Sequence, residues 1–120
     1  MTYGALPMHR LRSPLHKERH MSDNKVSVIA QAKPRAGMEE TLREKLLSLV
    51  EPTRAETGCI TYDLYQACDA TKIFMFYECW KSKGDLEKHL QKPYIKNFME
   101  TADELLAEPL TVSLWEKISA

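Results

Sequence analysis

The stretch Phe74-Met-Phe-Tyr-Glu-Cys-Trp80 decides the fold of this chain. It contains no Gly or Pro and consists mostly of aromatic and other apolar residues, which is typical of a β-strand. Both alternating sets of side chains are apolar, with Glu78 as the one charged residue. Because a sheet with one face in water alternates apolar with polar residues, we expect this strand to be covered on both faces. Glu78 is then a buried charge that requires a partner or a function.

Three more segments alternate apolar with polar residues and are predicted to be strands. They cover residues 25–33, 59–68 and 110–118, while the strand quoted above extends over 72–81. A short turn joins the second and third strands, which therefore form a hairpin. The expected register of this hairpin brings to one face of the sheet the side chains of Ile60, Tyr62, Leu64, Phe74, Phe76, Glu78 and Trp80.

Two helical segments complete the domain. Apolar residues three and four apart, starting at Met38, predict a helix that Pro52 kinks or ends. A second helix is predicted to begin at the N-cap Ser82 and to restart at Pro93 after a break. The order βαββαβ is that of a ferredoxin-like α+β fold, with a four-stranded antiparallel sheet and both helical segments on one face.

The face of the sheet without helices is also apolar. It is expected to carry Ile29, Met75, Tyr77 and Trp115. An apolar face of this size is not left in water, and a second copy of the same sheet is the simplest cover. We therefore expect a two-fold homodimer with the sheets face to face.

Length and charge limit the class of protein. The 120 residues suffice for one compact domain, and the net charge of +0 gives no reason to expect binding to nucleic acid. No apolar run approaches the roughly 20 residues that a membrane helix requires. Residues 1–22 show no hydrophobic period and carry a net positive charge, so we predict a disordered extension there and the folded domain over 23–120. A basic arm for targeting or for an anionic surface is the alternative, and Met21 offers a second start site.

The cysteines indicate a reducing compartment. There are three, Cys59, Cys68 and Cys79, and no secretory signal precedes them, so a cytoplasmic location is expected. Cys59 and Cys68 lie on one predicted strand, roughly 30 Å apart, and cannot pair while that strand is formed. No CxxC motif or Cys/His cluster is present, so no metal site is predicted.

Several motifs together resemble the antibiotic biosynthesis monooxygenase (ABM) family. They are Gly58-Cys59-Ile60-x-Tyr62-Asp63-Leu64, Phe76-Tyr77-Glu78-x-Trp80 and Leu86-x-x-His89-Leu90 followed by Pro93, and Arg54-Ala-Glu56 before the first of them also fits. The resemblance covers about residues 25–118. It implies a dimeric α+β barrel of two ferredoxin-like units and oxidation of phenols or quinols by dioxygen without a cofactor.

The resemblance also separates branches of that family. Haem-degrading relatives carry Trp where this chain has His89, and their haem-ligating His where it has Met99, so haem degradation is not expected. Other relatives include an isomerase that acts on a phosphorylated signal molecule. Many members read Thr-Pro-His where this chain reads Lys92-Pro93-Tyr94, so a second histidine is missing at that position.

His89 and Glu78 are the candidate catalytic residues. His89 shares an apolar helix face with Leu86 and Leu90, and this spacing alone favours an ordinary core histidine. The resemblance favours instead a base that takes a proton from a phenol near neutral pH. Glu78 either orients His89, holds a substrate hydroxyl, or is a structural acceptor for Tyr62 or the backbone.

A wall of aromatic residues is the candidate substrate site. It comprises Tyr62, Phe76, Trp80, Tyr94 and Phe98, each of which taken singly also fits an ordinary core. The predicted function is cofactor-independent oxidation of a phenolic or quinol-type substrate with dioxygen. The alternatives are an isomerase or proton-transfer enzyme on a small hydroxy-ketone, and a non-catalytic module that binds a small molecule.

Overall fold

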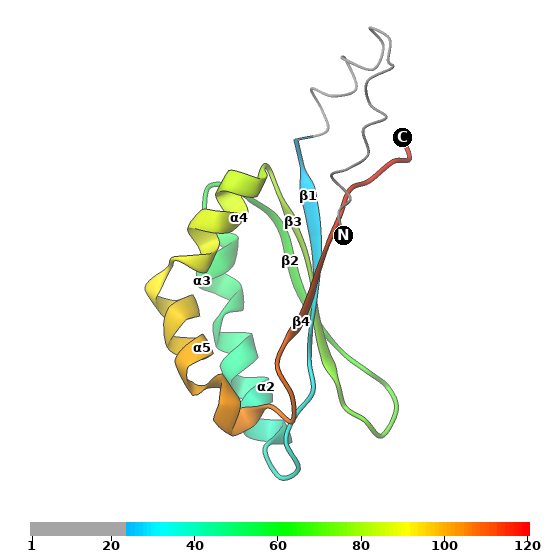
Figure 1. Ribbon diagram of the computed structural model, residues 1–120, viewed down its shortest axis with the longest axis vertical. Helices are drawn as coiled ribbons and strands as arrows, with labels where there is room; N and C mark the ends of the chain where they lie inside the picture. Colours follow the sequence, from blue (N-terminus) through cyan, green and yellow to red (C-terminus); the bar gives the residue numbers. More distant parts are fainter. Residues whose placement is uncertain (1–23) are drawn as a thin grey trace, which may run out of the picture.

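The computed structural model describes residues 24–120, and the extension predicted over residues 1–22 lies outside them. The elements in chain order are β1 (Val26–Ala32), α2 (Glu39–Ser48), α3 (Val50–Arg54), β2 (Cys59–Gln66), β3 (Phe74–Trp80), α4 (Lys83–Leu90), α5 (Pro93–Leu105) and β4 (Thr111–Trp115). The strands form one antiparallel sheet in the order β2-β3-β1-β4. All the helices lie on one side of it (Figure 1). The predicted ferredoxin-like α+β fold is confirmed.

The core lies between the sheet and the helices. Alternate residues of the two central strands point into it, as the period of two in a strand requires. The buried residues of β1 and β3 on this side are Val26, Val28, Ala30, Ala32, Phe74, Phe76, Glu78 and Trp80. Glu78 is thus a buried charge, as the sequence predicted, and it lies on the helix-covered face.

The hairpin of β2 and β3 has the expected register, with Tyr62 opposite Glu78. The expected place of Ile60 on the same face is wrong. A β-bulge between Cys59 and Thr61 inserts an extra residue, and Ile60 is turned outward with 44% of its surface exposed. The inward direction of the side chains is restored at Tyr62.

The first helical segment breaks at Leu49, before Pro52 rather than at it. Pro52 has no N–H to donate to the carbonyl of Ser48, so the helical hydrogen bonds are interrupted there and Pro52 falls in the first turn of α3. Beyond the break, Arg54 Nε donates to the carbonyl of Tyr62 at 3.0 Å. This bond fixes the end of α3 to β2 and places the residues after it beside the sheet.

The start of α4 is fixed by two close contacts. The hydroxyl of Ser82 accepts from the backbone N–H of Asp85, which confirms the predicted N-cap. Asp85 also lies directly over Gly58, where an added Cβ would sit 2.2 Å from its Cγ, so only glycine leaves room.

Pro93 is the first residue of α5, as predicted. Leu90 is 50% exposed and so is not the core residue expected.

The strand β4 is shorter than predicted. It ends at Trp115, opposite Ser27, because β1, the strand with which it pairs, begins one residue earlier at Val26. Ile118 is therefore outside the sheet and 94% exposed.

The face of the sheet without helices carries partly buried or exposed side chains, namely Ile29, Met75, Tyr77 and Trp115. In the described part of the chain, no helix is long and apolar enough to cross a membrane.

Candidate functional site

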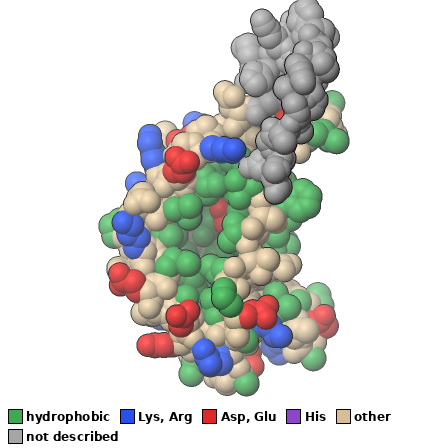
Figure 2. Space-filling view, viewed as in Figure 1, with side chains coloured by type: hydrophobic (Ala, Val, Ile, Leu, Met, Phe, Trp, Pro, Cys, Tyr) green, Lys and Arg blue, Asp and Glu red, His purple; other side chains and the backbone are tan. Residues whose placement is uncertain are grey.

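A cavity of about 410 Å³ lies between the sheet and helices α2, α4 and α5. Figure 2 shows it as a hollow surrounded mainly by hydrophobic side chains. Its wall on β1 consists of Val28, Ala30 and Ala32. Because larger side chains at these positions would fill the space, the small residues of β1 create the cavity. Its volume lies within the range of sites that bind small molecules.

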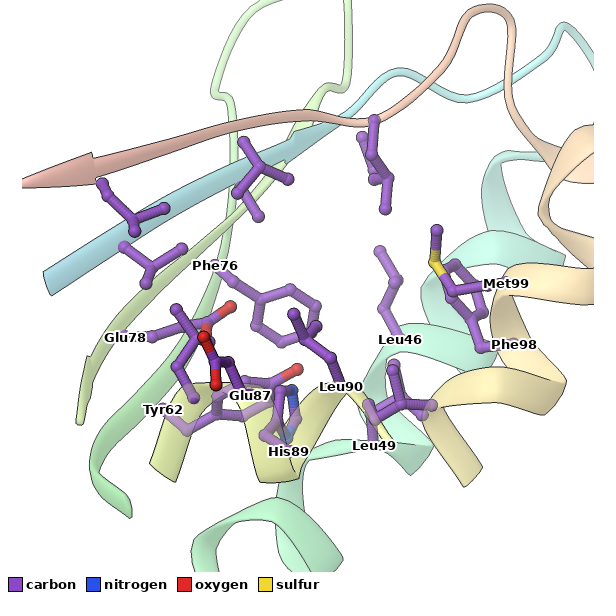
Figure 3. A pocket seen from close by; sticks show the side chains of 18 of the residues that line it. Leu46, Leu49, Tyr62, Phe76, Glu78, Glu87, His89, Leu90, Phe98 and Met99 are labelled. Carbon is purple, nitrogen blue, oxygen red and sulfur yellow. The ribbon is translucent and has the colours of Figure 1, made fainter. Parts of the chain in front are cut away.

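Three polar side chains come together at one end of this cavity. They are Tyr62 from β2, Glu78 from β3 and His89 from α4 (Figure 3). All three residues are at most 5% exposed. The structure therefore brings together both predicted catalytic residues, His89 and Glu78, with one of the predicted aromatic residues.

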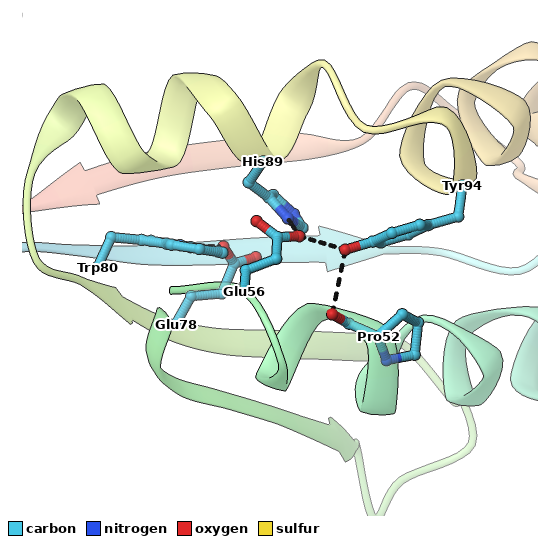
Figure 4. A network of polar contacts seen from close by, with 6 residues as sticks. All are labelled: Pro52, Glu56, Glu78, Trp80, His89 and Tyr94. Atoms are coloured by element: carbon cyan, nitrogen blue, oxygen red, sulfur yellow. Dashed lines mark hydrogen bonds and ion pairs between the residues drawn. The ribbon is translucent and has the colours of Figure 1, made fainter. Parts of the chain in front are cut away.

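The imidazole of His89 is fixed in place by the carboxylate of Glu56, which lies in the turn after α3. Nδ1 of His89 lies 2.9 Å from Oε2 of Glu56, and their side chains are only 4% and 8% exposed. The hydroxyl of Tyr94 donates to the same carboxylate oxygen and lies 3.2 Å from the carbonyl oxygen of Pro52 (Figure 4). Because a carboxylate only accepts hydrogen bonds, Nδ1 carries the proton and Nε2 keeps its lone pair.

Burial keeps this imidazole neutral. It lowers the pKa of His89 below the ordinary value, and the hydrogen bond and charge of Glu56 oppose the effect without cancelling it. The ring packs against Trp80 and Tyr62, with centroids 4.6 and 5.5 Å away. A neutral imidazole with its lone pair on Nε2 is a general base at pH 7.

Glu78 has a different partner from those the sequence suggested. Its Oε1 accepts from Trp80 Nε1 at 2.9 Å. The carboxylate bonded to His89 is that of Glu56, so the idea that Glu78 orients His89 is wrong. Burial raises the pKa of Glu78 to about 7, although the hydrogen bond from Trp80 acts in the opposite direction. At neutral pH, Glu78 is therefore present both as a donor and as an acceptor.

We expect the wild-type protein to lose stability between pH 5 and pH 8, and we expect Glu78→Gln to abolish this loss. Burial raises the pKa of Glu78 from 4.5 to about 7, so the folded state holds this proton more tightly than the unfolded state. Its contribution is therefore fully present below pH 4.5 and is lost as pH rises to about 7, by on the order of 3 kcal/mol. Urea unfolding at pH 5 and pH 8 measures the change.

The matched control for this prediction is Glu87→Gln, an exposed carboxylate at the mouth of the same cavity. The control is expected to keep the wild-type fall in stability between the two pH values. If Glu78→Gln keeps it as well, the carboxyl group of Glu78 is not the source of the pH dependence.

The predicted aromatic wall is only partly present. Tyr62, Phe76 and Phe98 line the cavity. Trp80 is fully buried beneath His89 and Glu78, outside the lining. Tyr94 also lies outside the lining, because its hydroxyl is directed to Glu56 on the other side of His89. Trp80 and Tyr94 thus support the polar residues and do not form the wall.

The donor groups do not form a metal site. Within residues 24–120, no group of three or more His, Cys, Asp or Glu side chains is placed to hold a metal ion. The three cysteines are free thiols.

The fold agrees with that of known proteins. The sequence family described as "Antibiotic biosynthesis monooxygenase" matches residues 25–101. The chain belongs to this family. "Putative monooxygenase Rv0793" of Mycobacterium tuberculosis is 37% identical over 89 residues, which cover 74% of this chain and 87% of that protein. Its solved structure has a TM-score of 0.76 at 33% identity and covers 80% of this chain and 97% of that one.

Two further relatives extend the comparison. The structure of PA3566 from Pseudomonas aeruginosa has a TM-score of 0.77 at 28% identity, over 82% of this chain and 98% of that one. The protein sll1783 of Synechocystis is 30% identical over 95 residues, 79% of this chain, and the match spans 65% of the length of that relative. Membership of the ABM family and the name of the mycobacterial relative support a monooxygenase-like role.

Sequence reasoning about this ABM domain missed Glu56 as a site residue. Glu56 belongs to the Arg54-Ala-Glu56 motif that resembles the family, so a signal was present. The helix break at Leu49 and the bond from Arg54 to β2 decide where Glu56 lies. Neither the position of the helix break nor the bond from Arg54 follows from the hydrophobic pattern, and so the pairing of Glu56 with His89 could not be predicted.

Proposed function

We propose that this ABM domain is a monooxygenase that oxidises a phenolic or quinol-type aromatic substrate with dioxygen and without a cofactor. The observation that supports it most directly is a neutral His89 paired with Glu56 at the polar end of an apolar cavity. The apolar wall suits a flat aromatic ring, and the polar end suits its hydroxyl group.

The proposed reaction starts with removal of the phenol proton by Nε2 of His89. The phenolate then transfers one electron to dioxygen, and the resulting radicals combine at a ring carbon that carries hydrogen. Transfer of that hydrogen as a proton to the outer peroxide oxygen breaks the O–O bond, which leaves a quinone carbonyl and hydroxide. His89 returns its proton to the hydroxide to form water. One oxygen atom thus enters the product and the other leaves as water.

The protein contributes proton transfer, orientation and exclusion of bulk water in this scheme. Glu56 accepts from Nδ1 and so stabilises the imidazolium that forms when His89 takes the proton. Glu78, with a pKa of about 7, serves as the hydrogen-bond partner of the substrate oxygen as its charge changes.

Oxygen consumption tests this proposal. Protein freed of metal and flavin is mixed with a panel of quinols and anthrone-type phenols, and uptake is followed with an oxygen electrode. Uptake proportional to protein concentration is the expected result. Turnover of a hydroxy-ketone without oxygen uptake would favour an isomerase, and thermal stabilisation by phenols without turnover would favour a binding module. Either result overturns the oxygenase proposal.

We expect Glu56→Gln to lower kcat for oxygen uptake by about 10- to 100-fold. The amide removes the negative charge beside Nδ1, so the imidazolium form of His89 is less stable and Nε2 is a weaker base. The acidic limb of the profile of kcat against pH should therefore move to lower pH, while KM changes little. Steady-state kinetics from pH 5 to pH 8 measure both effects.

The control for Glu56→Gln is Glu51→Gln on the preceding helix, whose side chain is 88% exposed. It carries the same loss of charge outside the cavity and is expected to leave kcat and the pH profile unchanged. Equal effects of the two substitutions would contradict the role assigned to Glu56.

We also propose that two copies associate through the apolar face of the sheet that has no helices. Tyr77 and Trp115 on this face are 38% and 56% exposed, which is unusual for aromatic residues of a single globular domain. Sedimentation at micromolar concentration is expected to give a dimer, and Trp115→Glu is expected to give a monomer because it buries a charge in the interface. A monomeric wild-type protein contradicts this proposal.

A further inference from the structure

The lining of the cavity is polar at one end only. Among the described residues that line it, every polar side chain comes from β2, β3 or α4. These include Tyr62, Glu78 and His89, which meet at one end in Figure 3. The lining side chains contributed by β1, α2, α5 and β4 are all apolar. A ligand that fills the cavity can therefore form hydrogen bonds to the protein at one end and only apolar contacts along the rest of its length.

The apolar end is built by two helices. Leu46 of α2 and Phe98 and Met99 of α5 lie at the end of the cavity away from Glu78 and His89 (Figure 3). Leu46 and Phe98 are 1% and 7% exposed and form a closed wall. A polar group of a ligand placed here would lose its hydrogen bonds to water and find no partner in the lining.

The rim of the cavity continues this apolar surface to the outside. Leu90 of α4, Met99 of α5 and Val112 of β4 all line the cavity, and they are 50, 50 and 55% exposed. Half-exposed apolar residues are common singly. All three belong to the lining of the same cavity, so together they extend its apolar surface to the exterior of the protein.

We propose that the natural ligand is a phenol or quinol whose ring carries a hydrocarbon extension with no polar group on it. The hydroxyl-bearing ring lies among Tyr62, Glu78 and His89, and the extension runs past Phe98 and Met99 to the rim. This inference rests on the proposed function for the identity of the ring, whereas the extension follows from the lining alone.

Binding of 4-alkylphenols tests the inference apart from any turnover. Titration calorimetry of the protein is carried out without oxygen, from phenol to 4-hexylphenol. Burial of each methylene is expected to tighten binding by about fourfold until the extension reaches the rim. A carboxylate at the end of a chain that stops within the cavity is expected to weaken binding relative to the plain alkyl chain of the same length.

A pair of substitutions on α5 locates the extension. Met99→Glu places a charge at the apolar end, and Asn97→Glu places the same charge on an exposed residue of the same helix outside the lining. Met99→Glu is expected to reduce the gain per methylene and to leave the affinity for phenol unchanged, whereas Asn97→Glu should change neither. Affinity that does not depend on chain length, or equal effects of both substitutions, overturns the inference. Failure of the oxygen-uptake test would leave these results standing, so the two proposals fail separately.

Discussion

Replacing His89 by Ala is expected to lower oxygen uptake by roughly 10²- to 10⁴-fold, the usual contribution of a general base. At the polar end of the cavity, the imidazole of His89 is neutral at pH 7 and its Nε2 lone pair can take a proton, because Glu56 accepts from its Nδ1. Without it, the phenol has to ionise by transferring its proton to water. Raising the pH should restore part of the activity of the variant, since the phenolate then forms in solution.

The matched control is Lys88→Ala, on the same helix but exposed and outside the cavity lining. It is expected to keep wild-type uptake and thus shows whether disturbance of α4 alone reduces activity. Phenol binding by His89→Ala, measured without oxygen, distinguishes lost chemistry from lost affinity. Uptake by His89→Ala within a few-fold of wild type would exclude His89 as the base.

Replacing Trp80 by Ala is expected to destabilise the fold by about 3 to 5 kcal/mol, as for other large buried aromatic residues. Trp80 has no exposed surface, packs against Tyr62 and His89, and donates to Glu78. Trp80→Phe keeps a ring and loses less stability, but it removes the N–H donor. Because that donor lowers the pKa of Glu78, Trp80→Phe is expected to raise it above about 7.

Urea unfolding measures the first effect, and the pH dependence of stability measures the second. Trp115→Phe makes the same chemical change at a residue that is 56% exposed and is expected to leave the pH dependence as in the wild type. A pKa of Glu78 that is unchanged in Trp80→Phe would show that the indole does not stabilise the carboxylate.

The strand Phe74–Trp80 predicted more of the molecule than any other segment. Its residues Phe74, Phe76 and Trp80 indicated a face covered by the helices, and its single charge indicated a buried carboxyl group at Glu78; all four residues are buried. Turn signals at Ser82 and Pro93 gave the starts of α4 and α5 correctly, because caps and prolines act locally. His89 was placed correctly toward the sheet by helical spacing.

What the sequence did not predict depends on contacts between distant segments. The outward turn of Ile60 follows from a bulge in pairing with β3, and a hydrophobic pattern carries no signal for an inserted residue. Trp80 and Tyr94 were assigned to the cavity wall because their ring types suit one. Their hydrogen bonds to Glu78 and Glu56 direct them elsewhere, and these bonds depend on the tertiary structure.

The most direct test of the central claim is the fate of labelled dioxygen. The metal- and flavin-free protein is supplied with ¹⁸O₂ and an anthrone-type phenol that bears hydrogen on the carbon to be oxidised, and the product is analysed by mass spectrometry. We expect one ¹⁸O atom per quinone in the wild type and labelled product formed roughly 10²- to 10⁴-fold more slowly with His89→Ala. A product without ¹⁸O, with hydrogen peroxide formed instead or with turnover that continues under argon, would contradict the monooxygenase account.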